Sequence, residues 1–260
     1  MKAPVMELMI DVGNTDTVLG HYQDGRMIHC WRLSSQLYRT EDECWVAVNS
    51  FFNSQKLDAL EIKGVCLSSV VPDLTLIYDR MTRKYLHTQA MIITPELDLG
   101  LKILYHNPQT VGADRICNAV AGKIKYGTPL IIIDFGTATT FDCINGDGDY
   151  LGGIICPGIA NAAAVLHHKA AKLPKIELQF PLQVIGRSTE ESMQSGIMYG
   201  SIEMIEGLLK KIEQELSAKP KVVSTGGLAH IIAEKTKCID FVDENLNIEG
   251  IYYIYKRNLR

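Results

Sequence analysis

Two short segments of the sequence combine an aspartate, a glycine and several hydroxyl side chains in a pattern that can bind phosphate. The first reads DVGNTDT over Asp11–Thr17, and the second reads DFGTATT over Asp134–Thr140. Glycine permits the positive φ that a tight turn needs, and backbone N–H groups in such a turn point toward an anion. The side chains add neutral donors, and the Asp11 carboxylate can hold a hydrated Mg²⁺. An ordinary β-turn explains one such segment, but two in one chain favour phosphate binding.

The two segments belong to a longer internal repeat. Leu8–Thr17 aligns on Ile131–Thr140 without gaps, and each window is an apolar run that ends in aspartate and continues into a hydroxyl-rich turn. The identical pairs are Ile10/Ile133, Asp11/Asp134, Gly13/Gly136 and Thr17/Thr140. Because the windows open the two halves of the chain, we predict two similar domains, over residues 1–115 and 116–260. No low-complexity linker separates them, so they are expected to pack closely.

A different chemistry is available at Asp114 and Arg115. The segment Asp114–Tyr126 carries apolar residues at helical spacing and is followed by Gly127, which predicts a helix and its end. Both side chains would lie at the helix N-terminus, where backbone N–H groups favour anions. A carboxylate there can accept a proton, and arginine presents a planar fork that suits a carboxylate ligand. The alternatives are a helix-capping carboxylate for Asp114 and a surface or interdomain salt bridge for Arg115.

The elements that must position these residues follow from the alternation of apolar strand-like runs with helical segments, which predicts an α/β fold. The predicted strands are Glu7–Asp11, Lys63–Val71, Ala90–Thr94, Pro129–Asp134 and the run that begins at Val222. The predicted helices are Thr75–Leu86, Asp114–Tyr126 and Ile202–Leu216. Glycines in Gly152–Gly158 and at Gly226 are expected to form turns beside a ligand, with plain connections as the alternative. Gly196 and Gly200 predict close helix packing.

The composition excludes several classes of protein. The 260 residues are 47% apolar and 22% charged, which is typical of a globular chain. A formal net charge of −4 argues against a nucleic-acid surface. The longest apolar run, Gly152–Leu166, is too short to span a bilayer. We therefore expect no nucleic-acid partner and no membrane association.

The cysteines and the missing motifs narrow the choice further. The seven cysteines are an odd number without a C-x-x-C pair, which fits reduced thiols and a cytoplasmic location better than disulfides or a zinc site. The chain lacks G-x-x-x-x-G-K-[S/T], G-x-G-x-x-G, H-E-x-x-H and G-x-S-x-G. The sequence thus lacks the motifs that usually indicate a P-loop, Rossmann, zinc-protease or serine-hydrolase function.

Four motifs, in their order along the chain, resemble those of type III pantothenate kinases, which belong to the acetate and sugar kinase, actin-like superfamily. They are Asp11–Val18, Gly112–Arg115, Asp134–Thr140 and Gly152–Gly158, and Asn245–Asn258 is similar to the family's closing segment. The resemblance implies two ribonuclease H-like (actin-like) domains with the active site in a cleft between them. It also implies ATP-dependent phosphorylation of pantothenate to 4′-phosphopantothenate, the first step of coenzyme A biosynthesis. Cys156 departs from the small residue of many relatives, which concerns packing more than chemistry.

The resemblance further implies a role for each residue that matches a family position. Asp114 is expected to accept the proton of the pantothenate hydroxyl, and Asp134 to coordinate the K⁺ or NH₄⁺ that the family requires in addition to Mg²⁺. The residues expected to bind ATP are Asp11, Val12, Gly13, Asn14, Thr15, Asp16, Thr17, Val18 and Thr137. The residues expected to bind pantothenate are Tyr105, Gly112, Ala113, Asp114, Arg115 and Thr189. Thr189 is expected to reach in from the partner subunit of a homodimer.

The residues alone allow two other functions. One is a different kinase or phosphatase of the same superfamily, acting on a sugar, a carboxylate or polyphosphate, although the cysteine-rich zinc motif of the repressor and sugar-kinase branch is absent. The other is a catalytically idle accessory or regulatory protein. Such a protein has no physical reason to keep Asp11, Asp114 and Asp134 together.

Overall fold

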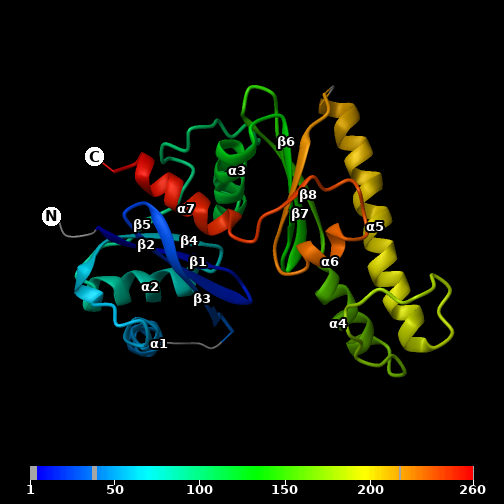
Figure 1. Ribbon diagram of the computed structural model, residues 1–260, viewed down its shortest axis with the longest axis horizontal. Coiled ribbons are helices and arrows are strands. Elements are labelled where there is room, and N and C mark those ends of the chain that lie inside the picture. Colours follow the sequence, from blue (N-terminus) through cyan, green and yellow to red (C-terminus); the bar gives the residue numbers. More distant parts are fainter. Residues whose placement is uncertain (1–4, 37–39, 217, 260) are drawn as a thin grey trace. The chain divides into compact units, whose positions relative to one another are not determined.

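The computed structural model describes residues 5–36, 40–216 and 218–259, which form two compact units (Figure 1). The first unit takes residues up to Leu101, His106–Ala121 and those from Leu246 on, and the second takes Lys102–Tyr105 and Gly122–Asn245. Each unit contains one mixed five-stranded sheet together with helices. The predicted α/β class is therefore confirmed.

The first unit is built on a sheet with the strand order β3-β2-β1-β4-β5. Its strands are β1 (Met6–Val12), β2 (Asp16–Gln23), β3 (Arg26–Ser34), β4 (Ile62–Ser69) and β5 (Met91–Ile92). The first three strands are antiparallel neighbours, whereas β4 runs parallel to β1 and β5 runs parallel to β4. Because β1 and β4 are parallel, they end at the same edge of the sheet, where Asp11 lies opposite Ser68.

Successive side chains of β1 point to opposite faces of this sheet. Leu8 and Ile10 belong to a buried core shared with helices α1 and α2. Glu7 and Asp11 therefore point to the other face, where Glu7 forms an ion pair of 2.8 Å with Lys256 of α7. The helices of the unit, with two 3₁₀ turns, are α1 (Glu41–Ser54), η1 (Ala59–Glu61), α2 (Pro72–Tyr85), η2 (Pro108–Thr110), the start of α3 (Ala113–Tyr126) and α7 (Leu246–Arg257).

The C-terminal helix α7 lies close to the sheet and to α3 because two glycines leave room for it. A Cβ on Gly64 of β4 would overlap the hydroxyl of Tyr255. A Cβ on Gly250 would overlap the backbone carbonyl of Cys117 in α3. The closing segment of the chain thus supports the face of the sheet toward which Asp11 points.

The second unit repeats the topology of the first, with the strand order β10-β9-β6-β7-β8. Its strands are β6 (Leu130–Phe135), β7 (Ala138–Ile144), β8 (Tyr150–Pro157), β9 (Lys221–Thr225) and β10 (Phe241–Val242). Ile131 and Ile133 belong to a core with α4 (Ile159–Lys169), α5 (Thr189–Leu216) and α6 (Ala229–Ala233). Asp134 points to the opposite face, as Asp11 does in the first unit.

The repeat is confirmed as a repeat of topology, but the gapless alignment is wrong beyond its glycine. In the first hairpin Val12 pairs with Thr17, whereas in the second Phe135 pairs with Thr139. The second turn is thus one residue shorter than the first. Thr17 corresponds to Thr139, which is also fully buried, and not to Thr140.

The two units divide the chain differently from the predicted boundary after Arg115. Helix α3 begins in the first unit and ends in the second, and α7 returns to the first unit. Helix α7 belongs to the first unit because it contacts β1 and β4 and buries its apolar residues there. A contact between the two ends of a sequence leaves no mark on local composition.

Helix α5 is the longest helix of the described residues, with 28 residues. It begins at Thr189, well before the predicted start at Ile202. Gly196 and Gly200 have no atom within 4 Å of an ideal Cβ, so the predicted close packing at these glycines is wrong within this chain. Over the ranges that the structure describes, no helix is long and apolar enough to cross a membrane.

Candidate functional site

The first hairpin, between β1 and β2, has a turn closed by its own backbone. Gly13 N donates to the carbonyl oxygen of Asp16 at 3.0 Å, and Ser35 N donates to that of Thr15 at 2.8 Å. Asn14 and Thr15 are exposed at the tip. The predicted donors are therefore accessible to a ligand.

Three of the residues predicted to bind ATP have side chains that are already engaged in the fold. Val12 and Thr17 are fully buried, and Thr17 Oγ1 lies 2.7 Å from Ser35 Oγ. Asp16 forms an exposed ion pair of 3.1 Å with Arg32. Val12 and Thr17 therefore expose no surface that a nucleotide could contact in this structure.

The Asp11 carboxylate ends β1 and is held by a residue that the motifs did not indicate. Ser68 Oγ donates to Asp11 Oδ1 at 3.0 Å, from the neighbouring strand β4. Ser68 is fully buried. Ser68 lies inside the predicted strand Lys63–Val71, and its role could not be recognised there because it depends on a contact 57 residues away in the sequence.

Asp114 is the second residue of α3, as predicted, and its side chain turns back onto the helix start. Its Oδ1 accepts a hydrogen bond of 2.8 Å from the backbone N–H of Arg115. A Cβ on Gly112 would overlap this same oxygen, so glycine is needed for the carboxylate to sit there. Burial raises the pKa of Asp114, and the N–H and the positive charge of Arg115 oppose part of that rise.

Arg115 is only 8% exposed, so the alternative of a surface salt bridge is wrong for this residue. A buried guanidinium needs partners of opposite charge or good acceptors. Ala113, which precedes this pair of residues, is buried at the helix start. The structure therefore places Gly112–Arg115 as one compact corner in the first unit.

Helix α7 contributes to this corner through a residue that sequence reasoning did not identify. Asn247 Nδ2 donates to the backbone carbonyl of Asp114 at 3.0 Å. The two residues are 133 positions apart in the sequence. The closing segment of the chain thus helps to fix the start of α3.

Cys117 lies one turn after Asp114 and is fully buried. Burial raises the pKa of its thiol far above the ordinary value, and the charges of Asp11 and Asp114 raise it further. The thiol of Cys117 is therefore neutral.

The second hairpin holds Asp134 next to a glycine rather than a serine. Gly226 has φ +90°, and a Cβ there would lie 2.7 Å from Asp134 Oδ1. Thr225, which is buried, lies opposite Asp134 in register. Glycine is therefore needed at position 226, because a side chain there would overlap the Asp134 carboxylate and the backbone of Phe135.

The turn that contains Thr137 is held from α4. Asn161 Nδ2 donates to the backbone carbonyl of Thr137 at 2.7 Å, and a Cβ on Gly158 would overlap that same oxygen. Gly158 therefore shapes this turn, in line with the expectation for the Gly152–Gly158 motif. Asn161 was missed, because a single asparagine in a predicted loop carries no distinctive pattern.

Tyr105 and Gly152 lie against each other in the second unit. Gly152 has φ +128°, and a Cβ there would come within 3.1 Å of two ring carbons of Tyr105. Tyr105 is 36% exposed. The structure thus places Gly152 under the Tyr105 ring, where glycine is needed both for its backbone conformation and for the contact.

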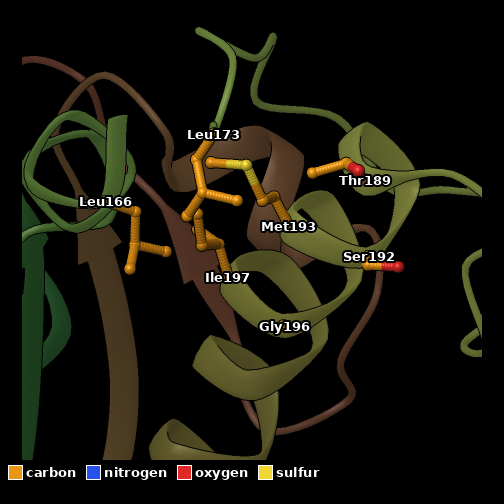
Figure 2. Close-up of a pocket in the computed structure, with 7 residues that line it drawn as sticks. All are labelled: Leu166, Leu173, Thr189, Ser192, Met193, Gly196 and Ile197. Carbon is orange, nitrogen blue, oxygen red and sulfur yellow. The ribbon is translucent and has the colours of Figure 1, made fainter. Parts of the chain in front are cut away.

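Thr189 begins α5 and lies on the rim of an apolar hollow of about 450 Å³. Figure 2 shows that Leu166, Leu173, Met193 and Ile197 converge in this hollow. The hydroxyl of Thr189 points away from them (Figure 2). The hollow contains neither Tyr105 nor the hairpin of Asp134.

The side chains that could act as metal ligands can be compared with the cations that the sequence predicts. In the described part of the chain, no group of three or more His, Cys, Asp or Glu residues is placed to hold a metal ion. Mg²⁺ is commonly bound through one or two carboxylates together with substrate phosphates. A carboxylate such as Asp11 beside an accessible hairpin fits that mode.

Comparisons with known proteins agree on one family. The family model described as type III pantothenate kinase matches residues 7–211. A type III pantothenate kinase from Halalkalibacterium halodurans is 47% identical over 254 residues, which cover 98% of this chain and 100% of that protein.

Solved structures show the same fold at lower identity. A Campylobacter jejuni protein, described as a candidate Baf family transcriptional activator, matches with a TM-score of 0.60 and 22% identity, covering 96% of this chain and 98% of that one. Component A of the (R)-2-hydroxyglutaryl-CoA dehydratase from Acidaminococcus fermentans matches with a TM-score of 0.55 and 12% identity, covering 98% and 100%. These similarities support two ribonuclease H-like units of the actin-like type.

Proposed function

This chain belongs to the type III pantothenate kinase family and phosphorylates pantothenate with ATP in coenzyme A biosynthesis, and we propose that Asp11, Asp114 and Asp134 perform three distinct tasks in that reaction. The pantothenate hydroxyl oxygen forms a bond to the γ-phosphorus of ATP, the bond from that phosphorus to the bridging oxygen breaks, and ADP leaves. Catalysis of such a transfer is mostly positioning and charge neutralisation. The observation that carries the proposal is the placement of Asp114 at the N-terminus of α3, where its Oδ1 accepts from the backbone N–H of Arg115 at 2.8 Å.

Asp114 accepts the proton of the attacking hydroxyl in this proposal. Its carboxylate is half-buried at the N-terminus of α3, and burial raises its pKa, which makes it a better base than an exposed aspartate. The backbone N–H of Arg115 holds one oxygen in place at 2.8 Å. The buried Arg115 guanidinium and Tyr105 are proposed to bind the pantothenate carboxylate end.

Asp11 and the hairpin tip bind the phosphates of ATP. The tip residues Asn14 and Thr15 are exposed, and the turn places backbone N–H groups where an anion can accept from them. Mg²⁺, when bound, would neutralise phosphate charge, and Asp11 is the residue proposed to hold it. Asp11→Asn is expected to raise the KM for Mg·ATP and the Mg²⁺ concentration for half-maximal rate.

Asp134 holds the monovalent cation, K⁺ or NH₄⁺. The position of Asp134 next to the end of β6, where it can offer an oxygen to a large cation, supports this assignment, and Thr137 on the same turn is proposed to contact the nucleotide. Asp134→Asn is expected to remove the stimulation by K⁺. Equal turnover of the unmodified enzyme in Na⁺ and K⁺ buffers would contradict the assignment.

The working unit is proposed to be a homodimer in which Thr189 serves the partner's site. Thr189 is exposed, and α4 and the following loop expose large apolar residues near it. These are Val165, Leu166, Leu182, Val184 and Ile185. Mixing Asp114→Asn subunits with Thr189→Ala subunits is expected to restore about one intact site per mixed dimer. A fully active monomer in sedimentation would contradict the proposal.

A cytoplasmic location is also proposed, because the seven cysteines are all free thiols and suit a reducing compartment. The proposals on substrate and cation are tested together in one ATP-consumption assay with purified protein. Pantothenate, common sugars and acetate are compared, each with and without K⁺. Turnover with pantothenate alone, and only with K⁺ or NH₄⁺, is the expected result.

A further inference from the structure

We propose that Ser68 is a positioning residue for Asp11: its hydroxyl fixes the carboxylate that binds Mg·ATP. The inference rests on the proposed role of Asp11 in ATP binding. It adds to that role a residue in a different strand.

The contact is built into the sheet. Ser68 lies directly opposite Asp11 in the parallel pairing of β1 with β4, and the pairs on either side keep the same register. Its Oγ is 3.0 Å from Asp11 Oδ1, and its side chain is fully buried. Because the backbone of both strands is fixed by pairing, the hydroxyl holds the carboxylate against rotation about its last bond.

The direction of the hydrogen bonds follows from the groups present. An ionised carboxylate only accepts, so the single proton of Ser68 is donated to Asp11. The Asp11 carboxylate thus accepts a charge-assisted hydrogen bond, which is roughly twice as strong as one between neutral groups.

The neighbouring Ser69 has the same chemistry but serves the local fold. Its Oγ accepts from the backbone N–H of Val71 at 3.1 Å and from Thr75 Oγ1 at 2.7 Å. These contacts stabilise the start of α2. Ser69 is thus a matched control for a serine that is structural only.

The second unit supports a specific need for a hydroxyl at this position. Asp134 has Thr225 opposite it in register, as Asp11 has Ser68. The next position differs, being Ser69 in β4 and Gly226 after β9. A hydroxyl residue thus lies opposite the aspartate in both units, whereas the residue that follows it is serine in one unit and glycine in the other.

The test compares Ser68→Ala, Ser69→Ala and Asp11→Asn in the full-length enzyme. A hydrogen bond to a charged group contributes roughly 1.5–3 kcal/mol, or about 10- to 150-fold. Ser68→Ala is expected to lower kcat/KM for Mg·ATP by about that factor and to weaken Mg·ADP binding in calorimetry. The KM for pantothenate should stay within about twofold. Ser69→Ala should lower only the Tm.

A second pair of variants tests the same contact without removing the whole side chain. Ser68→Thr keeps a hydroxyl, as Thr225 does opposite Asp134, and should keep kcat/KM for Mg·ATP near normal, whereas Ser68→Cys, whose S–H is a weak donor, should lower it. This pair decides the matter if Ser68→Ala does not fold. Equal ATP kinetics in Ser68→Thr and Ser68→Cys would then overturn the inference.

The outcomes separate this inference from the role of Asp11. If Asp11→Asn changes Mg·ATP binding but Ser68→Ala behaves like Ser69→Ala, Ser68 is not a positioning residue. If Asp11→Asn itself leaves Mg·ATP binding unchanged, the proposed role of Asp11 is wrong and the inference fails with it.

Discussion

Replacing Asp114 by asparagine separates the two roles that the structure allows for this carboxylate. Asp114 Oδ1 accepts from the backbone N–H of Arg115 at 2.8 Å, and asparagine keeps an acceptor of the same shape there. What asparagine loses is the ability to take a proton. Asp114→Asn therefore removes the proposed base and leaves the helix start nearly intact.

The expected loss of rate follows from the chemistry of the base. A positioned general base typically contributes about 10²–10⁴-fold, which corresponds to about 3–5 kcal/mol of barrier. kcat should fall by that factor, while the KM for pantothenate changes little because Arg115 is kept. The unmodified enzyme should also lose kcat/KM on the acid side, with a midpoint above the ordinary aspartate value of about 3.9, because burial raises the pKa of Asp114.

The direction in which Asp114→Asn changes the stability of the protein follows from the pKa shift of Asp114. The folded-state pKa of Asp114 is raised above its unfolded value. The ionised form is therefore disfavoured in the folded state, and this cost applies in full at pH values above both the unfolded and the folded pKa. Asparagine removes the cost but gives up a favourable interaction with the helix N-terminus of about 0.3–1 kcal/mol. The two effects oppose each other, so the Tm should shift by no more than a few degrees.

The matched control is Asp73, which is likewise the second residue of a 14-residue helix, but is exposed. Asp73→Asn should leave kcat unchanged and lower stability slightly. The measurements are steady-state kinetics, thermal unfolding and the pH profile of kcat/KM. Near-normal kcat in a folded Asp114→Asn protein would refute the assignment of Asp114 as base and leave only its helix-start role.

Three further predictions follow from particular contacts. Gly226→Ala would force a side chain onto φ +90° and toward Asp134 Oδ1, so the K⁺ concentration for half-maximal rate should rise several-fold; an unchanged K⁺ titration would contradict this. Gly152→Ala would displace the Tyr105 ring, so the KM for pantothenate should rise with the K⁺ response unchanged, and normal pantothenate saturation would count against it. His21 is fully buried, and its pKa is lowered by burial first and by a neighbouring histidine second, so stability present above pH 6.5 should be lost as the pH falls below it. His21→Phe should flatten the fall in Tm between pH 7.5 and 5.5, whereas an equal fall in both proteins would exclude His21 as its source.

The strands that carry the aspartates could be predicted because each is a nearly continuous apolar run. Strand β3 was not predicted, since it alternates exposed and half-buried residues and contains Arg26 and Arg32. The first half of α5 was also missed, because Gly196 and Gly200 lower helix propensity. Both elements are fixed by pairing or packing with distant parts of the chain rather than by their own residues.

The same division holds at the candidate site. Asp11, Asp114 and Asp134 could be picked out because each stands in a local motif with glycine. Ser68 and Asn247 could not, because their roles depend on contacts across 57 and 133 residues of sequence. A local pattern can indicate which groups react. The residues that position those groups lie in distant parts of the sequence, which only the fold brings close.

The two hairpins show how one repeated backbone can give two aspartates different surroundings. In both units an aspartate is the second-to-last residue of the central strand, and a buried hydroxyl residue lies opposite it in register. In the first unit Ser68 donates directly to the carboxylate, which fixes its orientation as a small ion with strict geometry requires. In the second unit the backbone at Gly226 lies so close to Asp134 Oδ1 that a Cβ would overlap it. In their proposed roles the aspartates are therefore not interchangeable: Asp11→Asn should alter the Mg²⁺ dependence and spare the K⁺ dependence, and Asp134→Asn should do the reverse.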